Sequence, residues 1–199
     1  MDTAKEWDAD LDYIGSRDHV HAVGAFALYY NTLEMALYGL LQRYLKGSIE
    51  AHSYMHSSLN NRQKVDFIKL MATHREDADG ADAVHHAMKC FDICAENRNL
   101  LLHAIPKLAE GVGADLVLMK ETARKPGYLT TYDFSLDQIR GAAIAADETE
   151  TYVFRLMRIL EERMGHNPFG ETPLPALPQP PLQPRKLSLS RRDPTPEAD

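Results

Sequence analysis

The segment Glu96–Ala104, ENRNLLLHA, places Arg98, Asn99 and His103 around three consecutive leucines. A histidine has an ordinary pKa near 6.5, so it can take up or release a proton near neutral pH. The planar fork of an arginine suits it to stabilising negative charge. The segment is therefore a candidate for acid–base chemistry by His103 at a negatively charged group held by Arg98, with Asn99 beside them. The alternative is that Arg98 and Asn99 are solvated and that His103 only caps the end of a helix.

Helix geometry sets how these side chains lie relative to one another. Each residue of an α-helix turns by about 100°, so Asn99 and His103 lie nearly above one another, and Arg98 lies roughly 140° away from His103. Asp92 and Glu96 extend the polar stripe of Asn99 and His103 toward the start of the helix. The long side chain of Arg98 either wraps back toward this stripe or faces outward.

Four helices are expected to position this segment, and each is predicted from apolar residues that recur at steps of three and four. They cover about residues 19–46, 58–74, 81–104 and 136–164. Ser57 and Ser58 favour the start of the second helix, and Ser135 is the expected N-cap of the fourth. Pro106 stops the third helix near Ile105, because the residue before a proline avoids helical geometry. ENRNLLLHA therefore lies on the last turns of the third helix.

The pattern changes after the third helix, where β-branched and aromatic residues flank the sequence RKPG. We expect a short hairpin that pairs about residues 115–122 with residues 128–134, with Pro126 and Gly127 at the centre of a type II turn. The predicted fold class is all-α, a four-helix bundle with a short β-hairpin before the last helix.

Composition divides the chain into three regions. Residues 1–18 form an N-terminal lead-in, residues 19–165 the helical domain and residues 166–199 a proline-rich tail. Eight of the eleven prolines lie between Pro173 and Pro196, a composition that favours polyproline II and cannot build a core. We expect the tail to be disordered, and its PxxP spacings are of the kind that some partner domains read.

The bulk composition excludes several classes of protein. The 199 residues are 44% hydrophobic and 26% charged with a formal net charge of −7, which excludes a strongly basic nucleic-acid-binding field. No apolar run approaches the roughly 18 residues that span a bilayer. The acidic, polar N-terminus lacks the pattern of a signal peptide. We expect a cytoplasmic protein without membrane contact.

Cys90 and Cys94 lie four residues apart on the third predicted helix, and His86 precedes Cys90 by four. These three residues share one helical face, but no fourth ligand at a suitable spacing accompanies them. His52 and His56 form another pair at helical spacing that also lacks further ligands. We therefore expect two buried thiols, surface histidines and neither a metal nor a cofactor.

The motif, its place near the end of the third helix and the order of the helices resemble the HEPN family. The family's hallmark, an arginine and a polar residue followed by a histidine, is matched here by Arg98, Asn99 and His103. The first predicted helix, FALYYNTLEMALYGLLQRYL with Asn31 and Glu34, is similar to the family's opening helix. The resemblance covers the helical domain and neither the lead-in nor the tail.

The resemblance implies a helical homodimer and, as in many members, a metal-independent endoribonuclease of toxin or defence type. The two arginine–histidine motifs would meet at the dimer interface in one composite cleft. His103 would act as general base or acid on the ribose 2′-hydroxyl or the leaving 5′-oxygen, and Arg98 would stabilise the charge on the scissile phosphate. Asn99 would orient His103 or bind phosphate, and the product would carry a 2′,3′-cyclic phosphate.

Two features depart from this expectation. Members that pair with nucleotidyltransferase antitoxins often carry a tyrosine two residues after the histidine, where this chain has Ile105. The acidic net charge also disfavours binding of RNA.

Three hypotheses about the function therefore stay open. The first is a ribonuclease with an RNA substrate and an antitoxin or partner protein. The second is a non-catalytic HEPN-like homodimeric scaffold or partner-binding module, and the third is a helical protein unrelated to the family. An exposed His103 that shares a cleft with Arg98 favours the first hypothesis over the second, whereas a buried His103 bonded to a local carbonyl favours the second.

Overall fold

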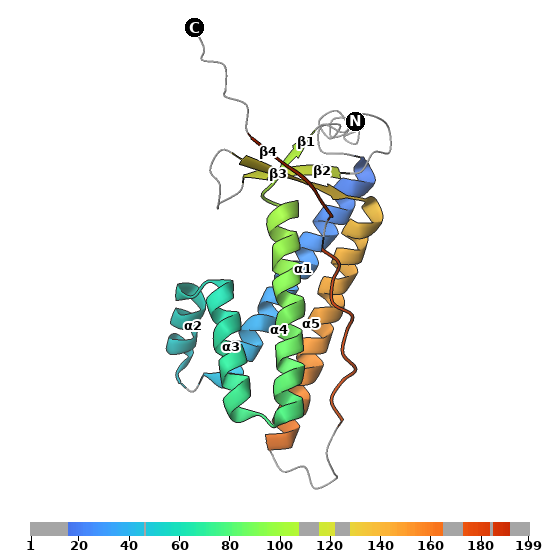
Figure 1. The fold of residues 1–199 in the computed structure, drawn as a ribbon. Coiled ribbons are helices and arrows are strands. Elements are labelled where there is room, and N and C mark those ends of the chain that lie inside the picture. The colour runs from blue at the N-terminus through green and yellow to red at the C-terminus, as the bar shows by residue number, and fades with distance from the viewer. Residues whose placement is uncertain are drawn as a thin grey trace, which may run out of the picture.

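The computed structural model of the chain (Figure 1) describes residues 16–45, 47–107, 116–121, 128–164, 173–183 and 185–191. Within these ranges the five helices are α1 (Arg17–Tyr44), α2 (Ile49–Ser58), α3 (Asn61–Arg75), α4 (Ala78–Leu101) and α5 (Leu136–Met164). The strands are β1 (Ile105–Lys107), β2 (Leu116–Glu121), β3 (Tyr128–Phe134) and β4 (Arg185–Arg191). The expectation of a predominantly helical fold is confirmed.

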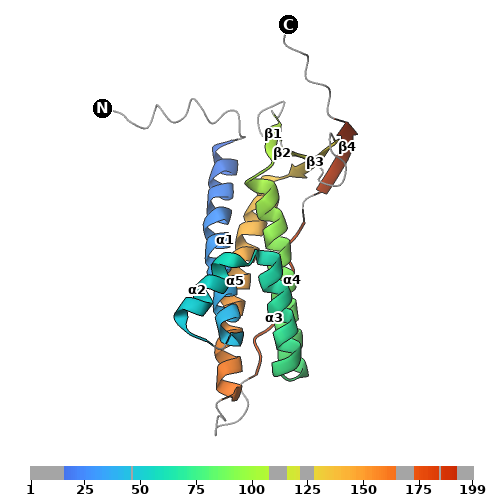
Figure 2. The same ribbon diagram turned by 90° about the vertical axis from the view of Figure 1, so that its left-hand side faces the viewer.

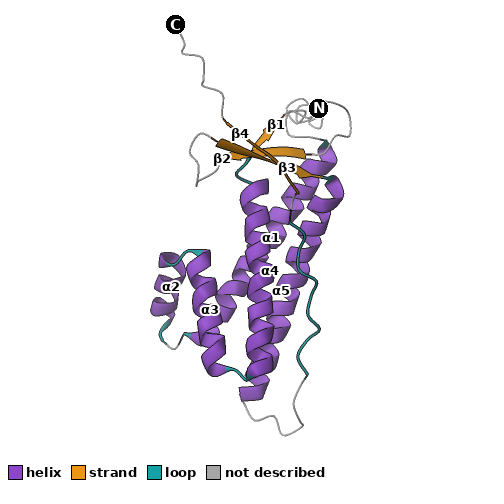
Figure 3. Ribbon diagram, viewed as in Figure 1, coloured by secondary structure: helices purple, strands orange, loops and turns teal. Residues whose placement is uncertain are grey.

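Three long helices, α1, α4 and α5, pack together along most of the molecule (Figure 3). α1 and α5 run in the same direction, and near their starts Arg140 lies 3.6 Å from Asp18. α4 runs the opposite way, so that Asp77 before its first turn meets Arg163 near the end of α5 at 3.1 Å. The buried stripe of α1 contains the apolar residues that its period predicts, namely Phe26, Tyr30, Leu33, Leu37, Leu40 and Tyr44. None of the described helices is long and apolar enough to cross a membrane.

α2 and α3 lie together on one side of the three long helices (Figure 2). α3 packs on α4 and α1, and it begins at a capping box in which the side chain of Asn60 accepts from the backbone of Gln63. The start predicted at Ser57 and Ser58 was therefore wrong, because these serines form the end of α2. α2 buries none of its residues. For that reason its sequence carries no clear apolar period, and it is a fifth helix that the sequence left unassigned.

α5 and α4 illustrate a correct and an incorrect prediction of helix ends. α5 spans the predicted residues, and Ser135 caps it: Ser135 Oγ accepts from the backbone N–H of Gln138 at 3.2 Å. α4 instead begins after the N-cap Asp77 and ends at Leu101, before the predicted end at Ala104. The N-terminal lead-in up to residue 15 lies outside the described residues.

A four-stranded antiparallel sheet of order β1-β2-β3-β4 covers the end of the bundle where α4 ends and α5 begins (Figure 1). β2 pairs with β3, with Leu116 opposite Phe134. These strands match the expected pair, but they form the centre of a larger sheet rather than an isolated hairpin. Leu116 and Phe134 are buried and belong to the same hydrophobic core as the helices. The turn expected at Pro126 and Gly127 lies outside the described residues.

The C-terminal segment corrects the predicted organisation of the chain. We expected residues 166–199 to be disordered, yet residues 173–183 run along α4 and α5, and β4 pairs with the edge of β3. We name residues 173–183 the strap. The segment needs no core of its own, because α4 supplies hydrogen-bond donors to its carbonyls and β3 supplies a strand ladder. Residues 165–172, 184 and 192–199 lie outside the described residues.

A buried carboxylate ties the end of α1 to the end of α3. Glu76 Oε1 accepts hydrogen bonds from Arg43 Nη2 at 2.9 Å and from the hydroxyl of Tyr44 at 3.0 Å. The side chains of Arg43 and Glu76 are each only 6% exposed. Burial, followed by the nearby Glu76 charge, raises the pKa of Tyr44 well above its usual value. Glu76 is therefore the acceptor on which both donors depend.

Replacing Glu76 by alanine leaves the buried Arg43 without its carboxylate, so we expect Glu76→Ala to lower the free energy of unfolding by about 3 kcal/mol or more. The control is Arg62→Ala, which removes an exposed pair with Asp66 and should cost less than about 1 kcal/mol. Urea unfolding followed by circular dichroism measures both losses. Equal losses in the two variants would contradict the role assigned to Glu76.

Candidate active site at the end of α4

The end of α4 and the turn after it hold the candidate residues. α4 ends at Leu101, and residues 102–104 form a turn that leads into β1. His103 therefore lies in this turn, and the helical stripe predicted to join Asn99 to His103 does not extend that far. The helix ends before Ala104 because the chain must turn here to bring β1 against β2.

The side chain of Arg98 brings the three candidate residues together. Arg98 Nη1 lies 2.7 Å from His103 Nε2 and 3.4 Å from Asn99 Oδ1. Of the two orientations left open by the sequence, Arg98 thus adopts the one that wraps back toward the histidine. Asn99 and His103 are exposed, and Arg98 is half-buried. An exposed His103 beside Arg98 differs from the buried, carbonyl-bonded histidine of the structural interpretation. The shared cleft that the catalytic interpretation also requires is not seen within the described part of the chain, because the pocket that Arg98 lines is formed without His103.

Tyr30 of α1 supports Arg98 from the core. The guanidinium carbon of Arg98 lies 5.9 Å from the centroid of the Tyr30 ring, a distance at which a cation is attracted to an aromatic face. The centroid of the Tyr30 ring in turn lies 6.0 Å from that of the Phe91 ring. Asn61 Nδ2 donates to the hydroxyl of Tyr30 at 3.3 Å. Burial, reinforced by Glu34, raises the pKa of Tyr30 well above its usual value. Tyr30 is therefore a neutral platform at physiological pH.

A pocket of about 520 Å³ opens between α1, α3 and α4 beside this cluster. Tyr30 and Phe91 lie at the buried part of its wall, whereas Arg62, Asp92, Glu96 and Arg98 carry its charge. The two carboxylates do not stand alone. Lys69 Nζ lies 3.2 Å from Asp92 Oδ2, and Gln183 of the strap donates to Glu96 Oε2.

These partners weaken the negative charge of Asp92 and Glu96 beside Arg98. Lys69 neutralises part of the Asp92 charge, and the amide of Gln183 occupies a lone pair of Glu96. The acidic side chains beside Arg98 are thus less repulsive toward an anion than two unpaired carboxylates would be.

Sequence reasoning missed Tyr30, Asn61 and Asn97. Tyr30 was assigned only to the buried stripe of α1, and Asn61 was assigned only to a helix. Asn97 is fully buried although it directly precedes Arg98, and its Nδ2 donates to the backbone oxygen of Leu182 at 2.9 Å. The available signal was its position seven residues after Cys90, which places an amide on the apolar face of α4.

The thiols and histidines singled out as alternatives are arranged as structural groups. His86 Nε2 donates to Pro178 O at 2.9 Å and lies 3.6 Å from Cys90 Sγ. Cys90 and Cys94 are buried and unpaired with each other as a disulfide. Burial raises the pKa of Cys90 and raises that of Cys94 to about 12, so both are protonated at neutral pH. Among the described residues, no three His, Cys, Asp or Glu side chains are placed to hold a metal ion.

The histidines of α2 are engaged with neighbouring groups. His56 lies 4.3 Å from the ring of Tyr38, and burial lowers its pKa. His52 Nε2 lies 3.2 Å from Leu45 O. Each ring contacts the end of α1 or the loop after it, so both help to seat α2 on the bundle.

The Arg98–His103 contact defines what the cluster can do chemically. A guanidinium only donates hydrogen bonds, so His103 Nε2 must be the acceptor. The ring is therefore neutral in this arrangement, with its proton on Nδ1, and it is a base rather than an acid. Arg98 has five N–H donors, so a guanidinium that holds His103 keeps others free for an anion. The cluster can bind an anion, and His103 can remove a proton next to it once Arg98 releases Nε2, the only lone pair of the ring.

Comparison with known proteins finds no protein-family model, no curated protein and no solved structure that matches this chain. Its function is therefore inferred from the site itself.

Long-range ¹H–¹⁵N NMR at pH 8 tests the geometry of the cluster through the tautomer of His103. We expect the parent protein to carry the proton on Nδ1, because Nε2 accepts from Arg98, and we expect Arg98→Ala to lose this bias. Arg158→Ala, on the outer face of α5, is the control and should leave His103 unchanged. A parent protein in which His103 is protonated mainly on Nε2 would rule out the contact.

Proposed function

We propose that this chain is a HEPN-like, metal-independent endoribonuclease whose site is completed in a homodimer. The observation that supports it most is an exposed His103 in contact with Arg98, which lines a pocket together with Asn99. The arginine suits phosphate and the neutral histidine suits a hydroxyl proton, and His103 is exposed beside the half-buried Arg98. The mostly helical fold is compatible with a four-helix HEPN-like bundle to which α2 is added.

The proposed reaction is transfer of the phosphoryl group to the neighbouring ribose oxygen. Arg98 turns from His103 to the phosphate, and the Nε2 lone pair freed in this way takes the proton of the 2′-hydroxyl. The 2′-oxygen then attacks the adjacent phosphorus. The bond from phosphorus to the 5′-oxygen breaks, and this oxygen is protonated as it leaves. The products are a 2′,3′-cyclic phosphate and a 5′-hydroxyl. Arg98 stabilises the charge that builds on the phosphoryl oxygens, and Asn99 holds either Arg98 or the phosphate.

This reaction needs a base and an acid at the same time, and that need supports the dimer. One copy of the cluster presents one histidine, which is neutral while Arg98 holds it. A second copy brings a second His103, and this one can be protonated when it is not held by its own arginine. The two histidines then divide the roles of base and acid. RNA, a second copy of the chain and an antitoxin or other partner protein remain the proposed partners.

The direct test is cleavage of a mixed-sequence RNA by the purified protein in the presence of EDTA. We expect the parent to release 2′,3′-cyclic phosphate ends and His103→Ala and Arg98→Ala each to lose about 10²–10⁴-fold in rate. Asn99→Ala should lose less, because its carbonyl contact with Arg98 is long at 3.4 Å. His74→Ala, an exposed histidine at the end of α3, is the matched control and should retain full activity.

The outcomes of this assay separate the competing functions. No cleavage by a folded, dimeric parent would move the function to the non-catalytic HEPN-like scaffold or partner-binding module. Cleavage that survives in both His103→Ala and Arg98→Ala at equal thermal stability would place the activity elsewhere.

A further inference from the structure

Prolines of the strap recur at a spacing of three residues. Pro175, Pro178 and Pro181 follow this period, and Pro184 continues it in the sequence. Pro175 and Pro178 are half-buried and Pro181 is buried, whereas the two residues after Pro175 and the two after Pro178 are exposed. A polyproline II helix has three residues per turn. The burial of the strap prolines therefore has the period of such a helix, with Pro175, Pro178 and Pro181 toward the bundle and Leu174 packed against the core beside them.

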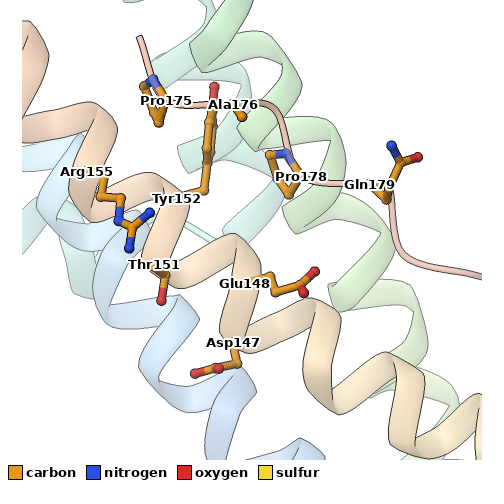
Figure 4. A pocket seen from close by; sticks show the side chains of 9 residues that line it. All are labelled: Asp147, Glu148, Thr151, Tyr152, Arg155, Pro175, Ala176, Pro178 and Gln179. Carbon is orange, nitrogen blue, oxygen red and sulfur yellow. The ribbon is translucent and has the colours of Figure 1, made fainter. Parts of the chain in front are cut away.

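The ring of Tyr152 on α5 lies beside the prolines of the strap. Tyr152 is 4% exposed and lines a pocket of about 440 Å³ together with Pro175 and Pro178 of the strap (Figure 4). Thr151 and Arg155 from the neighbouring positions of α5 line the same pocket. Prolines docked on an aromatic-lined groove are the usual mode by which proteins recognise polyproline II segments.

Two side chains of α4 donate hydrogen bonds to backbone carbonyls of the strap. His86 Nε2 donates to Pro178 O, and Asn97 Nδ2 donates to Leu182 O, each at 2.9 Å. A polyproline II helix makes no internal hydrogen bonds, and its prolines have no N–H. Carbonyl oxygens are thus the main polar feature that a proline-rich segment offers. The donors of α4 match that feature, and the ring of Tyr152 lines a pocket with two of the spaced prolines, Pro175 and Pro178.

We propose that His86, Asn97, Thr151, Tyr152 and Arg155 form a recognition groove for polyproline II segments, and that the strap of the same chain is its resident ligand. The groove and strap act as a receptor and a ligand joined in one chain, although Tyr152 belongs to the hydrophobic core and Leu174 of the strap packs against it. A separate peptide with the strap sequence therefore binds this groove once the strap is displaced. This inference rests on contacts of α4 and α5 and does not depend on the proposed ribonuclease activity.

The test uses the full-length chain with Pro175→Ser, Pro178→Ser and Pro181→Ser, which removes the docking face of the strap. A synthetic peptide of residues 173–184 is titrated into this variant and into the parent, and ¹H–¹⁵N NMR follows the side-chain amide of Asn97. A tethered ligand has an effective concentration on the order of millimolar, so binding of the free peptide with a Kd of about 1 mM or tighter is expected. The parent should not respond, because its own strap fills the groove.

Two matched peptides and one receptor variant show whether the expected features are recognised. A peptide with serine at positions 175, 178 and 181 should not bind, whereas a peptide with Leu177→Ala, on an outward face, should bind as the natural sequence does. Adding His86→Ala to the triple-serine chain should weaken binding about fivefold, the effect of about 1 kcal/mol for one hydrogen bond.

The inference would be overturned if the folded triple-serine chain showed no saturable shift up to about 5 mM peptide, well above the effective concentration of a tethered segment. An equal response of the parent would also overturn it, since the peptide would then bind elsewhere. If the triple-serine chain fails to fold, amide hydrogen exchange of the single variant Pro181→Ser replaces it. Exchange should speed up in β4, which follows the strap, and stay unchanged in α1; unchanged exchange in β4 would refute the inference.

Discussion

The contact of Tyr30 with Phe91 and Arg98 is the interaction on which the candidate site depends. Tyr30 belongs to the fully buried stripe of α1, so its position is set by the packing of the whole core. From that position it touches the ring of Phe91 and the guanidinium of Arg98, and it accepts a hydrogen bond from Asn61. One side chain thus links α1, α3 and α4 at the pocket. Arg98 is held in place by the core rather than by solvent, and His103 is held by Arg98.

The turn after α4 adds the second constraint. Pro106 excludes helical geometry only for the residue before it, and a helix could have continued to Ala104 on that ground alone. The chain leaves the helix earlier because β1 must reach β2 in an antiparallel register. This long-range pairing is invisible in the local sequence. It places His103 in a turn, within reach of Arg98, where a continuous helix would have set the two roughly 140° apart.

The amount that the sequence could predict therefore differs between parts of the molecule. α5 was predictable to its ends, because a long apolar period and a serine cap act locally. The residue types of the site were also predictable, since their chemistry belongs to Arg98, Asn99 and His103 themselves. α2 was not predictable, because a helix that buries nothing has no apolar period. The ordered strap was not predictable either, because its proline-rich composition suggested disorder. Its partners His86 and Asn97 look like ordinary helix residues until the chain has folded.

The central claim is that two copies of the Arg98–His103 cluster act on one phosphodiester, and a structure of the protein with an uncleavable dinucleotide tests it most directly. A dinucleotide in which hydrogen replaces the attacking 2′-hydroxyl keeps the phosphate and prevents cleavage. The account predicts this phosphate within hydrogen-bond distance of Arg98, with the His103 side chains of both copies on opposite sides of it. A phosphate bound away from Arg98, or held by one copy with the second cluster distant, would contradict the account.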